Sequence, residues 1–151
     1  IKEVGFDKTT FNVAPYRFEA GTPAVADVVG LGAALSFLER LDLNEVFAYE
    51  DEIMEYAQER LSAIDGVNIY AKSAHKTGSL SFNVGNVHPF DVGTLLDQFG
   101  IAIRTGHHCA QPVMKHFHIP GTARASFALY TTKSEIDTLA NGLERIIPML
   151  M

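Results

Sequence analysis

The chain has 151 residues, of which 47% are hydrophobic and 20% are charged, and its formal net charge is −6. This length and composition fit one globular domain, or a small domain joined to a piece of another, and exclude a disordered chain. The negative charge and the lack of a basic run argue against nucleic-acid binding, and no apolar stretch is long enough to span a bilayer.

The N-terminal third is predicted to consist of an irregular tail and one helix. Residues 1–23 are interrupted by proline and glycine, which break regular structure. A helix is predicted to follow as far as residue 40, with Thr22 as its N-cap and Pro23 at its first position. Small residues along one side of this helix predict that something packs closely there. Residues 1–41 therefore resemble a tail and a linker helix that belong to another body.

The remaining residues, 42–151, are predicted to form a small domain. Helices are expected over 42–64, 88–100 and 132–150, and strands over 67–70, 78–84, 101–104 and 123–130. One helical turn is expected over 112–117, and Phe47 and Met54 are expected to widen the apolar face of the first of these helices. This order predicts an α/β fold of the α+β type, a two-layer sandwich with a small mixed or antiparallel sheet and helices on one face.

Cys109 is the only cysteine of the chain. It cannot form an internal disulfide, so a reducing, cytoplasmic setting is expected. The surrounding segment, "RTGHHCAQPVM", supplies Arg104, His107 and His108 and follows a predicted strand. A polar segment of this kind is typical of a surface loop, and its positive charge and imidazoles can activate a thiol as a nucleophile.

Cys109 could instead have a structural role or bind a metal ion. Most lone cysteines are small buried core residues. The thiol could also bind zinc together with neighbouring histidines, namely His107, His108, His116 and His118. No second cysteine and no paired-histidine helix motif accompany them, so a bound metal is not expected. The two remaining histidines, His75 and His88, are predicted to be exposed turn residues.

Three segments resemble the group II cysteine desulfurases, the branch that includes the selenocysteine lyases. They are "RFEAGTPAVADVVGLGAALSFLERL", "FDVGTLLDQFGIAIRTGHHCAQPVM" and "RASFALYTTKSEIDTLANGLERI". They follow the order that they have in the C-terminal third of that family, and the resemblance extends over essentially the whole chain. The string "RTGHHCA" is the most specific part, because group I desulfurases have a serine-rich cysteine loop. The resemblance implies the C-terminal small domain of a fold-type I pyridoxal-phosphate enzyme, preceded by the end of the large domain in residues 1–41.

The resemblance also implies an activity. The full-length enzyme would convert L-cysteine, or L-selenocysteine, to L-alanine, using pyridoxal phosphate as its cofactor and working as a homodimer. Cys109 would hold the sulfur as a persulfide and pass it to an acceptor protein, in iron–sulfur cluster assembly. The family's cofactor-binding lysine lies upstream of these segments, and the chain begins with Ile1 rather than Met. We therefore expect a piece of a longer protein that neither holds the cofactor covalently nor is active alone.

Further residues receive roles from the same resemblance. Arg124 would bind the substrate carboxylate, for which a planar guanidinium group is well suited, and Arg104 would also lie at the substrate. Thr22 would contact the cofactor phosphate of the neighbouring subunit. From the chemistry of histidine alone, His107 and His108 could tune the thiol, transfer a proton or shape the loop by hydrogen bonding. Simpler roles remain possible for them, as surface, loop-bonding or helix-capping residues. A non-catalytic sulfur-relay or partner-binding domain and a zinc-binding domain are the alternative functions.

Overall fold

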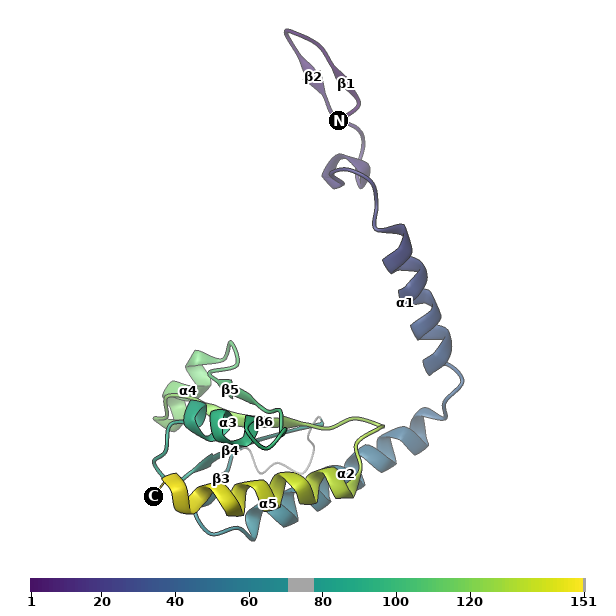
Figure 1. Ribbon diagram of the computed structural model, residues 1–151. Coiled ribbons are helices and arrows are strands. Elements are labelled where there is room, and N and C mark those ends of the chain that lie inside the picture. The colour runs from purple at the N-terminus through teal and green to yellow at the C-terminus, as the bar shows by residue number, and fades with distance from the viewer. Residues whose placement is uncertain (71–77, 151) are drawn as a thin grey trace. The chain divides into compact units, whose positions relative to one another are not determined.

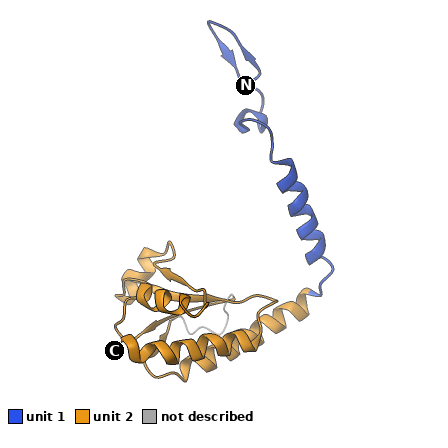
Figure 2. Cartoon of the chain, viewed as in Figure 1, with its two compact units in different colours: residues 1–42 blue, residues 43–151 orange. Residues whose placement is uncertain are grey.

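The structure is a computed structural model that describes residues 1–70 and 78–150. His75, predicted to lie in an exposed turn, is outside the described residues. The chain divides into two compact units, Ile1–Asp42 and Leu43–Met151 (Figure 2).

The first unit contains a hairpin, a short turn of helix and one long helix. Strands β1 (Glu3–Val4) and β2 (Thr9–Thr10) pair antiparallel, and a 3₁₀ helix covers Tyr16–Phe18. Helix α1 covers Val25–Leu38. The prediction that Thr22 is its N-cap is wrong. Ala24 occupies that position without a side-chain bond, because the first turn closes through a backbone hydrogen bond of 2.8 Å from the Val25 N–H group to the Pro23 carbonyl.

Helix α1 is apolar on most of its surface and stays exposed in its own unit. The side chains of Val28 and Val29 are each 67% exposed, and Leu31 is 61% exposed. Within residues 1–42 nothing packs against Gly30 or Gly32, so the predicted close packing is not formed inside this unit. Apolar surface of this extent is typical of a face that other protein covers.

The second unit has the predicted order of elements (Figure 1). Its helices are α2 (Leu43–Ser62), α3 (Pro89–Asp97), α4 (Gln111–Phe117) and α5 (Lys133–Leu150). Its strands are β3 (Val67–Ile69), β4 (Ser79–Val84), β5 (Arg104–Gly106) and β6 (Thr122–Ser126). Among the described residues, no helix combines the length and the apolar character that crossing a bilayer requires.

The four strands form one antiparallel sheet in the order β3-β4-β6-β5. Helices α2 and α5 lie side by side along the sheet, and α3 contacts α5 as well as β5 and β6 (Figure 1). The structure therefore confirms the predicted α/β fold, and the sheet is antiparallel rather than mixed.

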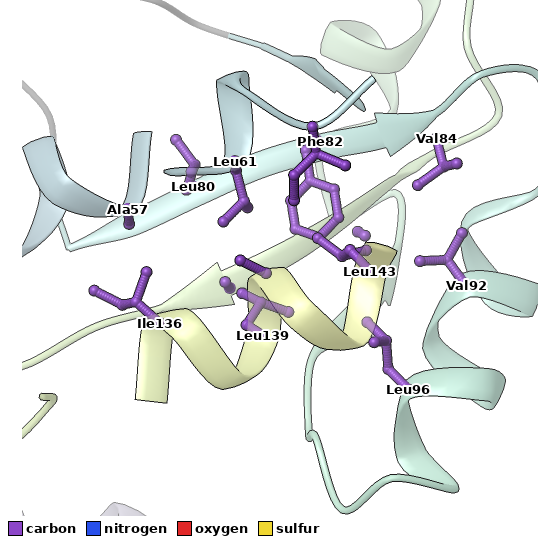
Figure 3. Close-up of a cluster of buried hydrophobic side chains, with 14 of the residues drawn as sticks. Ala57, Leu61, Leu80, Phe82, Val84, Val92, Leu96, Ile136, Leu139 and Leu143 are labelled. Atoms are coloured by element: carbon purple, nitrogen blue, oxygen red, sulfur yellow. The ribbon is translucent and has the colours of Figure 1, made fainter. Parts of the chain in front are cut away.

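The core lies between the sheet and these helices (Figure 3). Strand β4 alternates as predicted, so that Leu80, Phe82 and Val84 are all at most 1% exposed. Each buried side chain of this size stabilises the fold by about 1.5–3 kcal/mol. Helices α2, α3 and α5 complete the cluster with residues that include Ile53, Ala57, Leu61, Val92, Leu96, Ile136, Leu139 and Leu143. Met54 is buried as predicted, but Phe47 is 58% exposed, so that part of the predicted face is wrong.

Two boundaries differ from the predictions near the cysteine segment. The strand expected over 101–104 begins only at Arg104, because Ile101 and Ile103 pack against the core instead of joining the ladder. Strand β6 ends at Ser126, before the expected end at residue 130. The last helix is capped by Thr132: its Oγ1 accepts from the Glu135 N–H group at 3.3 Å, and the Glu135 carboxylate accepts from the Thr132 N–H group at 2.8 Å.

Candidate active site

The cysteine segment connects β5 to α4 as a short loop with unusual backbone angles. Cys109 is exposed on this loop and therefore does not fill the core. Gly106 has a φ of 120°, and His108 and Cys109 have φ values of 53° and 57°. Left-handed backbone at a residue other than glycine costs on the order of 1–3 kcal/mol and persists only where the surroundings enforce it. Two such residues in succession indicate that other contacts hold the loop in this shape.

His107 supplies a local contact within the loop. Its Nδ1 accepts a hydrogen bond from the Cys109 N–H group at 3.1 Å. Its carbonyl oxygen accepts from the Ala110 N–H group at 2.8 Å. The side chain is exposed. His107 therefore folds the loop tightly around Cys109 but reaches no other part of the domain through these bonds.

His108 connects the loop to the sheet. Its Nε2 lies 3.0 Å from the carbonyl oxygen of Thr122 and 3.0 Å from the Thr122 hydroxyl oxygen. A carbonyl oxygen only accepts, so Nε2 must carry a proton and donate it. The Nδ1 atom is buried and has no hydrogen-bond partner among the described residues.

The surroundings of His108 favour its neutral form. Burial of the ring lowers the pKa of His108 below its ordinary value of 6.5, and the bond to Thr122 opposes this change. The positive charges of Arg124 and Arg104 lower the pKa further. The neutral ring with its proton on Nε2 makes the observed hydrogen bond and leaves no N–H donor at the buried Nδ1, which has no partner among the described residues.

The C-terminal end of β5 and the residue that precedes β6 are in close contact beside the loop. A Cβ atom added to Gly121 would lie 2.8 Å from both the carbonyl carbon and the oxygen of Gly106, so only glycine fits there. Asn83 is buried on the central strand β4, and its Nδ2 donates to the Gly121 carbonyl at 2.9 Å. The start of the cysteine loop is therefore fixed against the middle of the sheet.

Both predicted substrate-binding arginines lie at this place. Arg104 of β5 and Arg124 of β6 are partners in the antiparallel register. Arg124 is half-buried, and its Nε is buried without a partner among the described residues. Thr122 and Arg124 are two residues apart on one strand, so they point to the same face of the sheet. A buried guanidinium nitrogen without a partner is suited to binding an anion from outside the chain.

The structure thus brings together five of the six predicted site residues, namely Cys109, His107, His108, Arg104 and Arg124. Thr22 belongs to the first unit, Ile1–Asp42. Sequence reasoning missed Thr122 and Asn83, which hold the loop and its neighbouring strand. Asn83 carried one signal that could have found it, as a buried amide on a central strand needs a hydrogen-bond partner.

No shared metal site is visible in the described part of the chain. Within residues 1–70 and 78–150, no group of three or more histidine, cysteine, aspartate or glutamate side chains is placed to hold a metal ion. His116 is exposed on α4, and His118 ends that helix with a left-handed φ of 55°.

The chain is similar to known proteins over most of its length. The family model described as aminotransferase class-V matches residues 1–139. A probable cysteine desulfurase of Halalkalibacterium halodurans is 49% identical over 145 residues, which cover 96% of this chain and 36% of that protein. A cysteine desulfurase of Klebsiella pneumoniae strain 342 is 47% identical and is covered to 35% of its length. The chain therefore spans about a third of the length of these curated relatives, 36% and 35%.

Solved structures show the same similarity. The cysteine desulfurase CsdA of Escherichia coli, described as an S-sulfonic acid, matches with a TM-score of 0.84 and 40% identity over 99% of this chain and 37% of its own. An apo cysteine desulfurase of Thermococcus onnurineus NA1 matches with a TM-score of 0.83 and 37% identity over 99% of this chain and 38% of its own. A mutant of C-DES with glycine covalently linked to its PLP cofactor matches with a TM-score of 0.70 and 26% identity over 90% of this chain and 33% of its own.

The resemblance to cysteine desulfurases that the sequence indicated is confirmed by these matches. The three solved structures have the same fold over the region that matches. The family model covers more than half of the chain, and the curated relatives and the first two solved structures bear the name cysteine desulfurase. The chain belongs to the aminotransferase class-V family.

Proposed function

We propose that this chain is part of a pyridoxal-phosphate-dependent cysteine desulfurase and supplies the thiol that takes the sulfur. The observation that carries the proposal is the position of Cys109. This thiol is exposed on a strained loop beside the paired residues Arg104 and Arg124. The named relatives support it, since they are cysteine desulfurases over the region that matches.

The proposed step at Cys109 is a transfer of sulfur between two sulfur atoms. The Cys109 thiolate attacks the sulfur of the substrate L-cysteine and forms a new S–S bond. The C–S bond of the substrate breaks, its electron pair stays with the carbon, and that carbon takes up a proton to give L-alanine. Cys109 is left as a persulfide, which is suited to passing its outer sulfur to another thiol by exchange.

Arg124 and Arg104 would bind the carboxylate of the substrate. The buried Nε of Arg124 lacks a partner among the described residues, and the carboxylate of an amino acid would supply one. Because Arg124 and the anchor of the cysteine loop, Thr122, are on one strand, the bound substrate would be held close to Cys109. These residues fix the position of the substrate, which is where an enzyme gains much of its rate.

The cofactor would be held mainly by residues outside this chain. When bound, pyridoxal phosphate supplies an electron sink at the substrate carbon. Thr22 is the residue of this chain that we propose to contact the cofactor phosphate of the neighbouring subunit in a homodimer. Its hydroxyl fits this role, because Ala24 occupies the N-cap position of α1 and leaves Thr22 unused by the helix.

The remaining parts of the proposal follow from the resemblance. The full-length protein would work in the cytoplasm, deliver sulfur to an acceptor protein for iron–sulfur cluster assembly, and accept L-selenocysteine in place of L-cysteine. Direct exchange with an acceptor is supported by the exposure of the Cys109 side chain.

The test is mass spectrometry of the full-length enzyme after incubation with L-cysteine. We expect the peptide that contains Cys109 to gain the mass of one sulfur atom. The Cys109→Ser variant should fold and retain its cofactor but pass no persulfide sulfur to an acceptor, because a hydroxyl cannot hold sulfur for exchange. An enzyme that delivers sulfur while this peptide is never modified would overturn the proposal.

A further inference from the structure

We propose that His108 is the positioning residue of sulfur transfer, and that its Nε2–H bond to Thr122 sets the direction in which Cys109 presents its thiol. This inference rests on the proposed function, because it assigns a role within the sulfur-transfer step. It separates His108 from its neighbour His107, which the sequence leaves equivalent.

The backbone of the cysteine loop has a conformation that needs an external contact to hold it. His108 and Cys109 both have left-handed φ values, 53° and 57°. Neither residue is a glycine, so each would relax to negative φ if nothing held it. A change of φ at either residue would turn the Cα–Cβ bond of Cys109 and move its sulfur away from its present position.

The side chain of His108 extends from the loop to the sheet. The bond that the Cys109 N–H group donates to His107 Nδ1 spans only two residues and stays inside the loop. The His108 ring reaches Thr122, which is 14 residues away on β6. Among the described residues, His108 is the only side chain of residues 107–110 with a hydrogen bond to the sheet.

Thr122, the hydrogen-bond partner of His108, is itself held in place by its neighbours in the sheet. Thr122 is 1% exposed and is paired with Gly106 in the sheet register. The preceding residue, Gly121, touches the backbone of Gly106 and accepts a hydrogen bond from Asn83. Thr122 is therefore a rigid reference point for the loop.

Arg124 lies on the same strand as Thr122. It lies two residues after Thr122 on the same strand and on the same face. The bond from His108 to Thr122 therefore holds the loop with the thiol in register with the arginine that we propose to bind the substrate carboxylate. His108 would act on the reaction through this distance, without touching the substrate.

The chemistry of the bond defines the informative substitutions. Glutamine can place an N–H donor at about the reach of Nε2, whereas phenylalanine keeps the ring and has no donor. We therefore compare His108→Phe and His108→Gln in the full-length enzyme. His116→Gln is the matched control, because His116 is an exposed histidine on the neighbouring helix α4.

The main measurement is the single-turnover rate at which the Cys109 peptide gains sulfur, together with the KM for L-cysteine. In His108→Phe we expect the rate to fall about 10- to 100-fold, while KM stays within about twofold, because Arg124 still binds the substrate. His108→Gln should recover to within about threefold of the wild-type rate, and His116→Gln should match the wild type. Thermal unfolding identifies any variant that does not fold, and His108→Asn then replaces His108→Phe, since the shorter amide does not reach Thr122.

A second measurement separates this inference from the proposed function. The rate at which iodoacetamide alkylates Cys109 reports on the loop without any turnover. We expect this rate to depart from wild type by about threefold or more in His108→Phe and to return in His108→Gln. If wild-type enzyme gains no sulfur at Cys109, the proposed function fails. The alkylation rates still test whether the bond between His108 and Thr122 positions the Cys109 thiol. The inference is overturned if folded His108→Phe matches the wild type, or if His108→Gln is as impaired as His108→Phe.

Discussion

Arg104 and Arg124 lie opposite each other across the β5–β6 pair. Residues directly opposed in antiparallel strands point to the same face with Cβ atoms about 4.5–5.5 Å apart, and like charges at that spacing destabilise the pair. The Nε of Arg124 is also buried without a partner among the described residues. An anion bound between the two guanidinium groups would remove both costs, which is consistent with our proposal that this pair binds a substrate carboxylate.

The first prediction tests this pair in the full-length enzyme. Arg124→Ala should lower kcat/KM for L-cysteine at least about tenfold, since a desolvated charge pair is worth on the order of 2–5 kcal/mol. Arg124→Lys should recover only part of the activity, because lysine lacks the planar fork. Arg145→Ala is the control: Arg145 lies on α5 with its guanidinium group 4.3 Å from the centroid of the Phe99 ring, and its loss should leave steady-state kinetics unchanged. Normal kinetics in Arg124→Ala would remove Arg124 from substrate binding.

The second prediction concerns the contact between Gly106 and Gly121. Gly121→Ala should lower the free energy of unfolding by about 1–3 kcal/mol, because its methyl group would meet backbone atoms that cannot turn aside. The new Cβ would lie 2.8 Å from the Gly106 carbonyl group. Denaturant unfolding measures the change, and sulfur gain at Cys109 should slow in the same variant. If Gly121→Ala has wild-type stability, the backbone at Gly106 can move to accommodate the added methyl group, and the prediction is wrong.

The third prediction concerns the core. Phe82→Ala should lower the free energy of unfolding by about 3–5 kcal/mol, because it leaves a cavity between the sheet and its helices. The Phe82 side chain is 0% exposed. Phe90, which is 63% exposed on α3, provides the matched control. Its replacement by alanine should change the stability by less than about 0.5 kcal/mol in denaturant unfolding. Equal losses in the two variants would contradict the core assignment.

The fourth prediction is a pH dependence of stability that comes from His108. Its pKa is lowered in the folded state relative to its ordinary value of 6.5, so the unfolded chain takes up this proton at a higher pH than the folded chain does. The stabilising contribution is therefore fully present above that ordinary value and is lost as the pH falls from it toward the lower folded pKa. Unfolding midpoints between about pH 5 and 8 should show this loss in wild type and a smaller loss in His108→Gln. If the unfolding midpoints of wild type and His108→Gln change identically with pH, His108 has the same pKa in the folded and the unfolded chain, and the prediction is wrong.

Much of the fold was predictable, because its elements carry their own periodicity. Strand β4 alternates Leu80, Phe82 and Val84 against polar residues, and this pattern fixes its buried face. The strand start at Arg104 was not predictable in the same way. Ile101 and Ile103 alternate like a strand, but their burial comes from packing against the core and not from pairing. Periodicity reports burial, and it does not distinguish these two causes.

The sequence indicated most of the residues that the structure brings together at the candidate site, but not their geometry. Cys109, Arg104 and Arg124 were found from residue type and from the family resemblance. The register that places the two arginines opposite each other depends on which strands pair, and no local pattern contains that information. The left-handed backbone at His108 and Cys109 also has no sequence signal, because positive φ is usually indicated by glycine or asparagine. Thr122 is an ordinary strand residue until its partner on the loop is known.

The fixed direction of Cys109 has a consequence for the order of events in sulfur transfer. A thiol on a long, mobile segment can collect sulfur at one location and release it at another. Cys109 lies on a short loop that the His108 side chain bonds to β6, so we expect its sulfur to keep one location. The sulfur donor and the sulfur acceptor must then react at the same atom, one after the other. Alanine has to leave before the acceptor arrives, and the full-length enzyme should show the parallel double-reciprocal plots of a ping-pong reaction.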